Sequence, residues 1–116
     1  MNIEEIHDYC MAKKGVTASF PFDGDTLVFK VAGKMFLFIA LEKNSANVKC
    51  DPARAIELRE QYPFVIPGYH MNKMMWNTIE TIDDVAPSLL TGWIDDSYAL
   101  VAAKLTKKER DRYGFA

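Results

Sequence analysis

The chain of 116 residues has few cysteines, glycines and prolines, the residues on which disulfide-rich and fibrous proteins depend. It contains two cysteines, Cys10 and Cys50, which lie far apart and form no C-x-x-C pair, so we expect no disulfide framework. Six glycines and five prolines are too few for a collagenous or low-complexity chain. A chain of this length, with 49% hydrophobic and 26% charged residues, can bury a core without staples, and we expect a single domain over residues 1–116.

The sequence pattern also has little that would direct the protein into a membrane. Glu4, Glu5 and Asp8 stand where a secretory signal needs a basic start. The longest apolar run, residues 35–41, is far shorter than the ~20 residues that span a bilayer. Together with the scattered cysteines, these features predict a cytoplasmic protein with reduced thiols and no membrane partner.

Three segments have the pattern of helices. Asn2 and Glu5 have the spacing of a capping box, which predicts a first helix ending near Gly15. Asp51 followed by Pro52 predicts the start of a second helix, because aspartate caps a helix and proline fits its first turn. A third helix is predicted after Ala86-Pro87 from side chains at helical spacing: Leu90, Trp93, Ile94, Ser97 and Val101.

The segments between these helices have the pattern of strands. Residues 26–31 and 34–41 flank Ala32-Gly33, which predicts a β-hairpin. The second of these strands is apolar on both faces, which predicts a central strand with helices over one face and another layer over the other. Shorter extended segments are predicted at residues 16–22, 47–50, 64–66 and 69–79. This order predicts an α+β protein with a mostly antiparallel sheet packed by helices.

Charge is distributed unevenly, although the formal net charge is only -2. Basic residues outnumber acidic ones by seven to four in residues 30–76 and by five to two in residues 104–116, whereas residues 77–103 carry five acids and no base. A local basic patch can bind phosphates on an acidic protein, because remote acids are screened beyond ~8 Å at physiological salt. Lysines on an ordinary solvated surface give the same count, so charge alone leaves both interpretations open.

Two cysteines and two histidines match the ligand count of a structural zinc site. Only His7 and Cys10 form a tight pair, however, and Cys10 shares the apolar face of the first helix, while Cys50 and His70 lie far along the chain. We therefore expect no metal site.

Enzymatic arrangements are weak in the sequence. Cys50 directly precedes a helix and could pair with His70 as an activated thiolate, but Asp51 adds a negative charge beside it and no oxyanion-hole pattern follows. The acid pairs Asp83-Asp84 and Asp95-Asp96 could bind cations. Alternatively, Asp83-Asp84 suit the segment that leads into a helix, and Asp95-Asp96 suit the solvent-exposed face of a helix. We expect no enzyme, no catalytic residue and no cofactor.

Residues 67–78 form the least ordinary stretch of the chain. Lys73 can contact a phosphate, Asn72 and His70 can form hydrogen bonds, and the aromatic residues can stack on unpaired bases. The alternative interpretation is that the aromatic residues pack over the sheet and the polar residues solvate their edges.

Several motifs follow one another in a characteristic order: Gly15-Val16-Thr17, Phe20-Pro21-Phe22-Asp23, residues 26–31 before Gly33-Lys34-Met35-Phe36, Cys50-Asp51-Pro52, and residues 67–73 before Trp76-Asn77-Thr78. Over essentially the full chain this order resembles the MmcQ/YjbR family. The resemblance implies a small α+β domain with a fold similar to the frataxin/CyaY type. It also implies a DNA-binding protein with a double-wing motif and a poorly defined biological role.

The resemblance further implies DNA contacts, with the first at a possible wing tip: Lys34, Arg59, His70, Asn72, Lys73 and Trp76. Relatives often carry a basic residue and a histidine where this chain has Met74-Met75, so we expect weak binding to DNA. The alternative is a protein partner that docks on an apolar patch of Met74, Met75 and Trp76, because methionine adapts readily to apolar partners.

Overall fold

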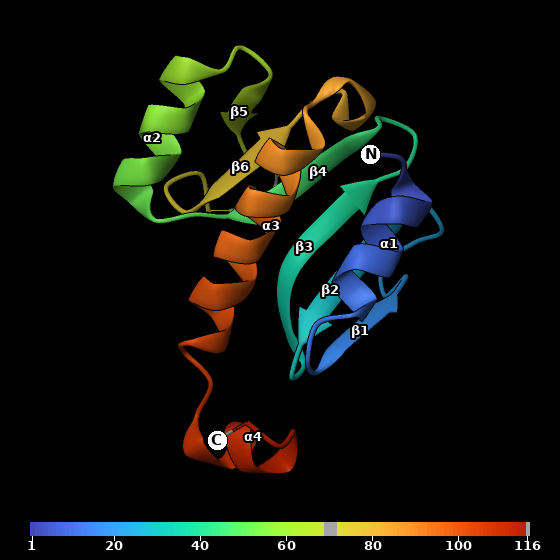
Figure 1. Cartoon of the computed structure of the whole chain (residues 1–116), viewed down its shortest axis with the longest axis vertical. Coiled ribbons are helices and arrows are strands. Elements are labelled where there is room, and N and C mark those ends of the chain that lie inside the picture. The colour runs from blue at the N-terminus through green and yellow to red at the C-terminus, as the bar shows by residue number, and fades with distance from the viewer. Residues whose placement is uncertain (69–71, 116) are drawn as a thin grey trace.

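The computed structural model describes residues 1–68 and 72–115. Its helices are α1 (Ile3–Met11), α2 (Pro52–Gln61), α3 (Pro87–Ala102) and α4 (Lys107–Arg112), with a 3-10 turn η1 (Ile82–Asp84). Its strands are β1 (Val16–Ser19), β2 (Thr26–Val31), β3 (Lys34–Ala40), β4 (Ser45–Lys49), β5 (Val65–Pro67) and β6 (Trp76–Ile79). All six form one antiparallel sheet in the order β1-β2-β3-β4-β6-β5 (Figure 1).

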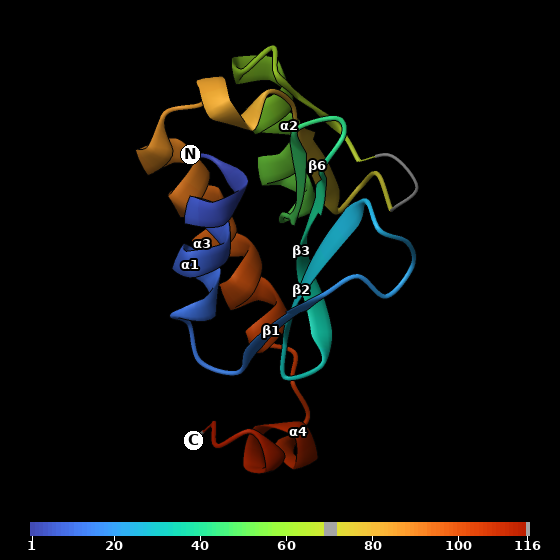
Figure 2. The ribbon, with the colours of Figure 1, turned by 90° about the vertical axis from the view of Figure 1, so that its right-hand side faces the viewer.

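The core lies between the sheet and the helices. Figure 2 shows α1 and α3 on one side of the sheet, and their buried residues meet Phe29 and Leu37 of the sheet in a single cluster with Ile6 and Leu90. Within the described residues, no helix covers the opposite face (Figure 2). The predicted α+β architecture with a mostly antiparallel sheet is confirmed.

Local sequence signals place the first two helix starts. The Asn2 side chain accepts a hydrogen bond from the Glu5 backbone N–H at 2.8 Å, and the Glu5 side chain accepts one from the Asn2 N–H at 2.9 Å. This reciprocal pair is the predicted capping box. Asp51 likewise accepts from the backbone N–H of Ala53 at 3.2 Å, and Pro52 occupies the first helical position of α2.

The β2–β3 hairpin turns at the predicted dipeptide. Ala32 and Gly33 both have positive φ, 49° and 82°, as a type I′ turn requires, and this turn matches the twist of the two strands. Phe29 pairs with Leu37 and Lys30 pairs with Met35, so one residue of β3 between them has no partner in β2. The result is a β-bulge.

That bulge explains why two consecutive residues of β3 are buried on the same side of the sheet. Phe36 and Leu37 are both fully buried in the core, and the Phe36 ring meets Tyr98 of α3 edge-on at 5.4 Å between centroids. The sequence predicted another layer over the second face. Instead, Phe38 on that face is only half-buried and packs against the Trp76 ring, with their centroids 5.9 Å apart.

Two segments differ from the sequence prediction. Residues 69–79 were expected to be extended, but β6 begins at Trp76 and a turn precedes it; residues 69–71 lie outside the described part of the chain. The end of the chain, where the sequence showed only an excess of basic residues, contains α4, whose start is a second capping box formed by Thr106 and Glu109. Among the described residues, no helix combines the length and apolar composition needed to cross a membrane.

Candidate nucleic-acid interface

The Arg59 side chain of α2 forms two hydrogen bonds within the protein. Its Nε donates to the Asn77 side-chain oxygen at 2.7 Å, and a terminal nitrogen donates to the Lys73 carbonyl. Asn77 is 1% exposed and in turn donates to the Ala55 carbonyl of α2 at 3.2 Å. The guanidinium therefore ties the turn before β6 to α2, so its predicted DNA contact would compete with these bonds.

The other predicted residues of this segment divide between solvent and interior. Asn72 and Lys73 are exposed, and the Asn72 side chain accepts a hydrogen bond from the Met74 N–H at 3.0 Å, which shapes the turn. Trp76 is only 6% exposed and lies against Phe38, as the alternative packing interpretation predicted. His70 falls outside the described residues.

Gly68, directly after β5, packs closely against Trp76 at the start of β6. The Gly68 N–H donates to the Trp76 carbonyl at 2.9 Å. A Cβ at position 68 would lie 2.9 Å from the Trp76 Cβ, which is too close for any side chain, so the close approach of the backbone to Trp76 requires glycine here.

Lys34 lies at the tip of the β2–β3 hairpin and reaches α4. Its Nζ is 3.5 Å from a Glu109 carboxylate oxygen. The backbone N–H donated within the Thr106 capping box and the nearby Lys34 ammonium hold the pKa of Glu109 below its usual range. Glu109 is therefore a fixed negative charge at neutral pH, and it joins α4 to the hairpin.

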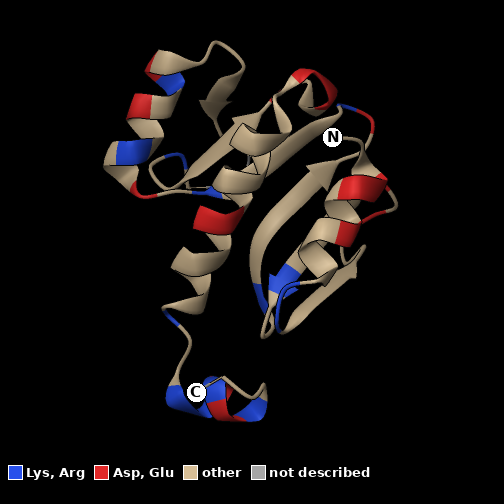
Figure 3. Ribbon diagram, in the orientation of Figure 1, with Lys and Arg blue, Asp and Glu red and all other residues tan. Residues whose placement is uncertain are grey.

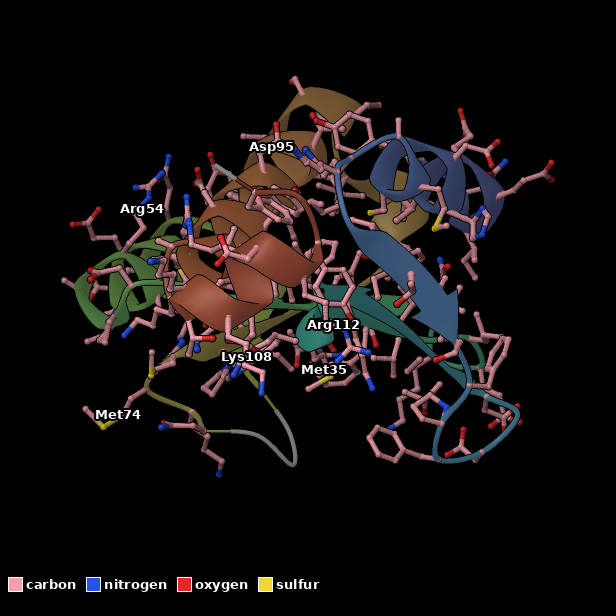
Figure 4. The ribbon with its side chains drawn as sticks, turned by 90° about the horizontal axis from the view of Figure 1, so that it is seen from below. Met35, Arg54, Met74, Asp95, Lys108 and Arg112 are labelled. Atoms are coloured by element: carbon pink, nitrogen blue, oxygen red, sulfur yellow. The ribbon has the colours of Figure 1, made fainter. Side chains whose placement is uncertain are left out.

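Between the hairpin tip and α4 lies a pocket of about 500 Å³. Its charged lining consists of one carboxylate, Glu109, and four cations: Lys34, Lys49, Lys108 and Arg112. Figure 4 shows Met35, Lys108 and Arg112 around this region from below the molecule. Within the described residues, neither the Lys49 nor the Lys108 ammonium has an ion-pair partner.

The turn that carries Lys73 lies at the same end of the sheet. Lys49 pairs with Trp76 in the ladder between β4 and β6, and the Cys50 N–H donates to the Met75 carbonyl at 2.7 Å. We call five residues the cationic end: Lys34, Lys49, Lys73, Lys108 and Arg112. Figure 3 shows the basic residues of α4 and the hairpin at the lower end of the molecule, and acidic ones on α1 and η1 above them.

The cationic end contains two of the predicted contacts, Lys34 and Lys73. Sequence reasoning missed Lys49, Lys108 and Arg112 as site residues. The available signal was the excess of basic residues in residues 30–76 and 104–116, but nothing in the sequence indicates that these two segments meet.

The thiols lack the surroundings of a nucleophile. Cys10 and Cys50 are both free and buried. Burial raises the pKa of Cys10 to about 12 and raises the pKa of Cys50, where the Arg54 charge opposes the shift only in part. Thiolate formation is therefore disfavoured at neutral pH at both positions.

One aspartate of each acid pair is bound to a protein partner. Asp83 accepts from the Asn44 side chain at 2.8 Å, and Asp95 contacts Lys13 at 2.5 Å and the Tyr9 hydroxyl at 2.7 Å. Burial opposes ionisation of Asp95, but the bonds from Lys13 and Tyr9 outweigh it and keep its pKa below the usual range. Across residues 1–68 and 72–115, no three His, Cys, Asp or Glu side chains gather closely enough to hold a metal ion.

The predicted apolar patch has a different composition in the structure. Trp76 is buried, whereas Met74 is 69% exposed and Ile56 of α2 is 53% exposed. Both line a hollow of about 190 Å³ with Pro52, Arg59 and Lys73. An apolar surface is therefore present, but Ile56 rather than Trp76 accompanies Met74.

Comparison with known sequences finds relatives over most of the chain. The YjbR family model matches residues 11–100. The Escherichia coli O157:H7 uncharacterized protein YbdF is 33% identical over 99 residues, which cover 84% of this chain and 81% of YbdF. The uncharacterized protein YjbR of Escherichia coli K12 is 30% identical over 112 residues, covering 95% of each chain.

Solved structures have the same fold. The crystal structure of the Deinococcus radiodurans protein DR2400 has a TM-score of 0.89 and 33% identity, covering 99% of this chain and 89% of that one. A Pseudomonas syringae protein has a TM-score of 0.74 and 26% identity, covering 87% of this chain and 99% of that one. The match to DR2400 includes α4, which lies beyond the part of the chain that the family model covers.

Proposed function

The chain belongs to the YjbR family, and we propose that it is a non-enzymatic, cytoplasmic protein that binds DNA weakly through its cationic end. The observation that carries this proposal is that one pocket gathers cations from three separate segments, the hairpin tip, β4 and α4, while the turn that carries Lys73 adjoins the end of β4. Phosphate contacts supply most of the affinity in non-specific DNA binding, and lysine and arginine make those contacts.

The net charge of -2 is compatible with this function. The molecule is 40 Å long, several times the ~8 Å over which physiological salt screens charges. Acidic residues on α1 and η1 therefore repel DNA at the other end only weakly. The predicted contacts of Asn72 and Lys73 remain available, because both side chains are exposed in the turn that precedes Trp76, the residue with which Lys49 pairs.

Fluorescence anisotropy with a labelled DNA duplex at 20 and 150 mM salt tests the proposal. The Lys108→Ala, Arg112→Ala double variant is expected to weaken binding and to lower the salt slope by about 2, roughly one unit for each lost phosphate contact. The matched control is Lys43→Ala, Arg54→Ala, which removes the same charge from two residues that do not line the pocket and should leave the slope unchanged. Equal slopes in both double variants would contradict the proposal.

A protein partner is the second candidate function, favoured by the exposed Ile56 and Met74 side chains that line one hollow. Absence of DNA binding at 20 mM salt, where non-specific DNA-binding proteins associate, would exclude DNA and favour this candidate. In that case Met74→Asp would be expected to abolish partner binding without changing the fold, because the side chain is exposed.

A further inference from the structure

The pocket between the hairpin tip and α4 has two kinds of wall. Part of its lining is apolar: Val101 is 5% exposed, Ala32 is 3% exposed and Met35 is half-buried. Its charged lining comes from the four cations and Glu109. A ligand that fills this pocket must therefore combine strong negative charge with an apolar body.

The net positive charge of the pocket lining favours a ligand with more than one negative charge. Four cations against one carboxylate leave an excess of three positive charges. Glu109 compensates Lys34, from which it is 3.5 Å distant, so most of the uncompensated charge belongs to Lys49, Lys108 and Arg112. A phosphate monoester carries about -1.5 to -2 at neutral pH, whereas each backbone diester of DNA carries a single charge. The pocket suits the monoester better.

The size and shape of the pocket point to an organic phosphate. About 500 Å³ lies within the range of ~300–1,000 Å³ typical of small-molecule sites. Arg112 lies over the Tyr113 ring at 5.7 Å, and both line the pocket, so a planar cation and an aromatic ring are present together on one side. Inorganic phosphate would leave the exposed part of the Met35 side chain without a partner.

We propose that this pocket binds a phosphate monoester carried on an organic group, with Lys49, Lys108 and Arg112 holding the phosphate and Val101 and Met35 contacting the organic part. This inference deepens the proposed function and rests on it, because the pocket belongs to the same cationic end. The monoester has two sources, a free nucleoside monophosphate or the phosphorylated end of a nucleic-acid strand.

Isothermal titration calorimetry of the full chain with adenosine 5′-monophosphate, adenosine and inorganic phosphate tests the chemistry. The monophosphate is expected to bind, adenosine to show no heat, and inorganic phosphate to bind at least tenfold more weakly than the monophosphate. Lys49→Gln and, separately, Lys108→Gln should weaken monophosphate binding at least tenfold. The second variant changes an exposed side chain with no ion-pair partner among the described residues, so we expect it to leave the fold unchanged.

A second arm distinguishes the two sources and separates this inference from the proposed function. It compares 12-nucleotide single strands that carry either a 5′-phosphate or a 5′-hydroxyl. At least fivefold tighter binding of the phosphorylated strand identifies a nucleic-acid end, whereas equal binding of the strands together with monophosphate binding identifies the free nucleotide. Lys73→Ala is the matched control, because Lys73 belongs to the cationic end but does not line the pocket, and it should leave monophosphate binding unchanged.

Two results overturn the inference. Salt-dependent duplex binding without any preference for a monoester would overturn it and leave the proposed function intact. Absence of binding to the monophosphate, to either strand and to the duplex would overturn both.

Discussion

Arg59 illustrates how one side chain can support a surface without forming it. The guanidinium joins the buried Asn77 side chain to the Lys73 carbonyl and thereby fixes the turn that presents Asn72 and Lys73. A DNA-binding defect in an Arg59 variant would therefore report a displaced turn as readily as a lost phosphate contact. Lys73 and Lys108 are better probes, because both side chains are exposed.

The structural role of Arg59 predicts a loss of stability. Arg59→Ala should lower the free energy of unfolding by about 2 kcal/mol, because it leaves a buried Asn77 oxygen without its donor. Urea denaturation measures this change. Arg54→Ala, on the same helix, is the control: that exposed arginine pairs with Glu57 at 3.1 Å, and its loss should cost under about 1 kcal/mol. Equal costs for the two variants would contradict the role assigned to Arg59.

The buried Cys10 thiol makes the free energy of unfolding depend on pH. Burial raises its pKa from 9.0 to about 12, so between these values the folded thiol holds a proton that the unfolded thiol has lost. The stabilisation is fully present below pH 9 and is lost as the pH rises toward 12. Tyr9, whose pKa is raised to about 12 chiefly by its hydrogen bond to Asp95, adds to the loss above pH 10.

The free energy of unfolding should therefore fall on raising the pH above about 9, by at most ~1.4 kcal/mol per pH unit for this thiol. Urea denaturation at pH 8, 9 and 10 measures the slope. Cys10→Ala should be less stable at every pH, because it leaves a cavity, but its slope between pH 9 and 10 should be shallower. An unchanged slope would exclude Cys10 as its source.

At the scale of elements, the short helix α4 is stabilised by contacts at its start and just beyond its end. Six residues are far too few for a helix to be stable alone in water. Its start is fixed by the Thr106–Glu109 capping box, with hydrogen bonds of 2.8 and 3.1 Å, and the Lys34 ion pair fixes it to the hairpin. Beyond its end, Phe115 packs close to Gly15. The cap therefore controls one wall of the pocket.

Thr106→Ala should destabilise α4 locally by about 1 kcal/mol, the usual cost of losing a cap. Hydrogen exchange at residues 107–112 should accelerate about fivefold, while the amides of β2 and β3 keep their protection. Thr91→Ala is the control, since Thr91 donates within α3 to the Pro87 carbonyl and caps no helix. A uniform acceleration throughout the sheet would show that α4 unfolds only with the whole domain.

At the scale of the whole molecule, charge is separated along the longest axis. The basic residues of the hairpin and α4 lie at one end of the 40 Å length, and acidic residues lie on α1 and η1 (Figures 1 and 3). Such a molecule presents a positive end to a polyanion despite its net charge of -2.

The protein should therefore be retained on a heparin column at pH 7.5 and low salt, although a uniformly charged protein of net charge -2 would not be. The Lys108→Ala, Arg112→Ala variant should elute at lower salt, because two cations of one end are lost. The Lys43→Ala, Arg54→Ala variant has the same net charge and should elute with the native protein. Identical elution of the two variants would show that net charge, not its placement, governs retention.

The sequence by itself determined the features that depend on near neighbours. The capping box at Asn2 and the Asp51-Pro52 start follow from side chains that bond within one turn, and the Ala32-Gly33 hairpin follows from backbone freedom at two residues. The α+β class followed from the order of these elements. The exposed positions of Lys34 and Lys73 could be predicted from a motif, because exposure at a turn is itself local.

Only the tertiary structure decided which distant segments meet. The β-bulge at Phe36, the internal bonds of Arg59 and the burial of Trp76 depend on partners from other elements. The pocket joins the hairpin tip to α4 across more than 70 positions of sequence, and Lys49 enters it only because β4 lies beside β3 in the sheet. Charge counts reveal an excess of cations, but the packing of strands and helices decides that they share one surface.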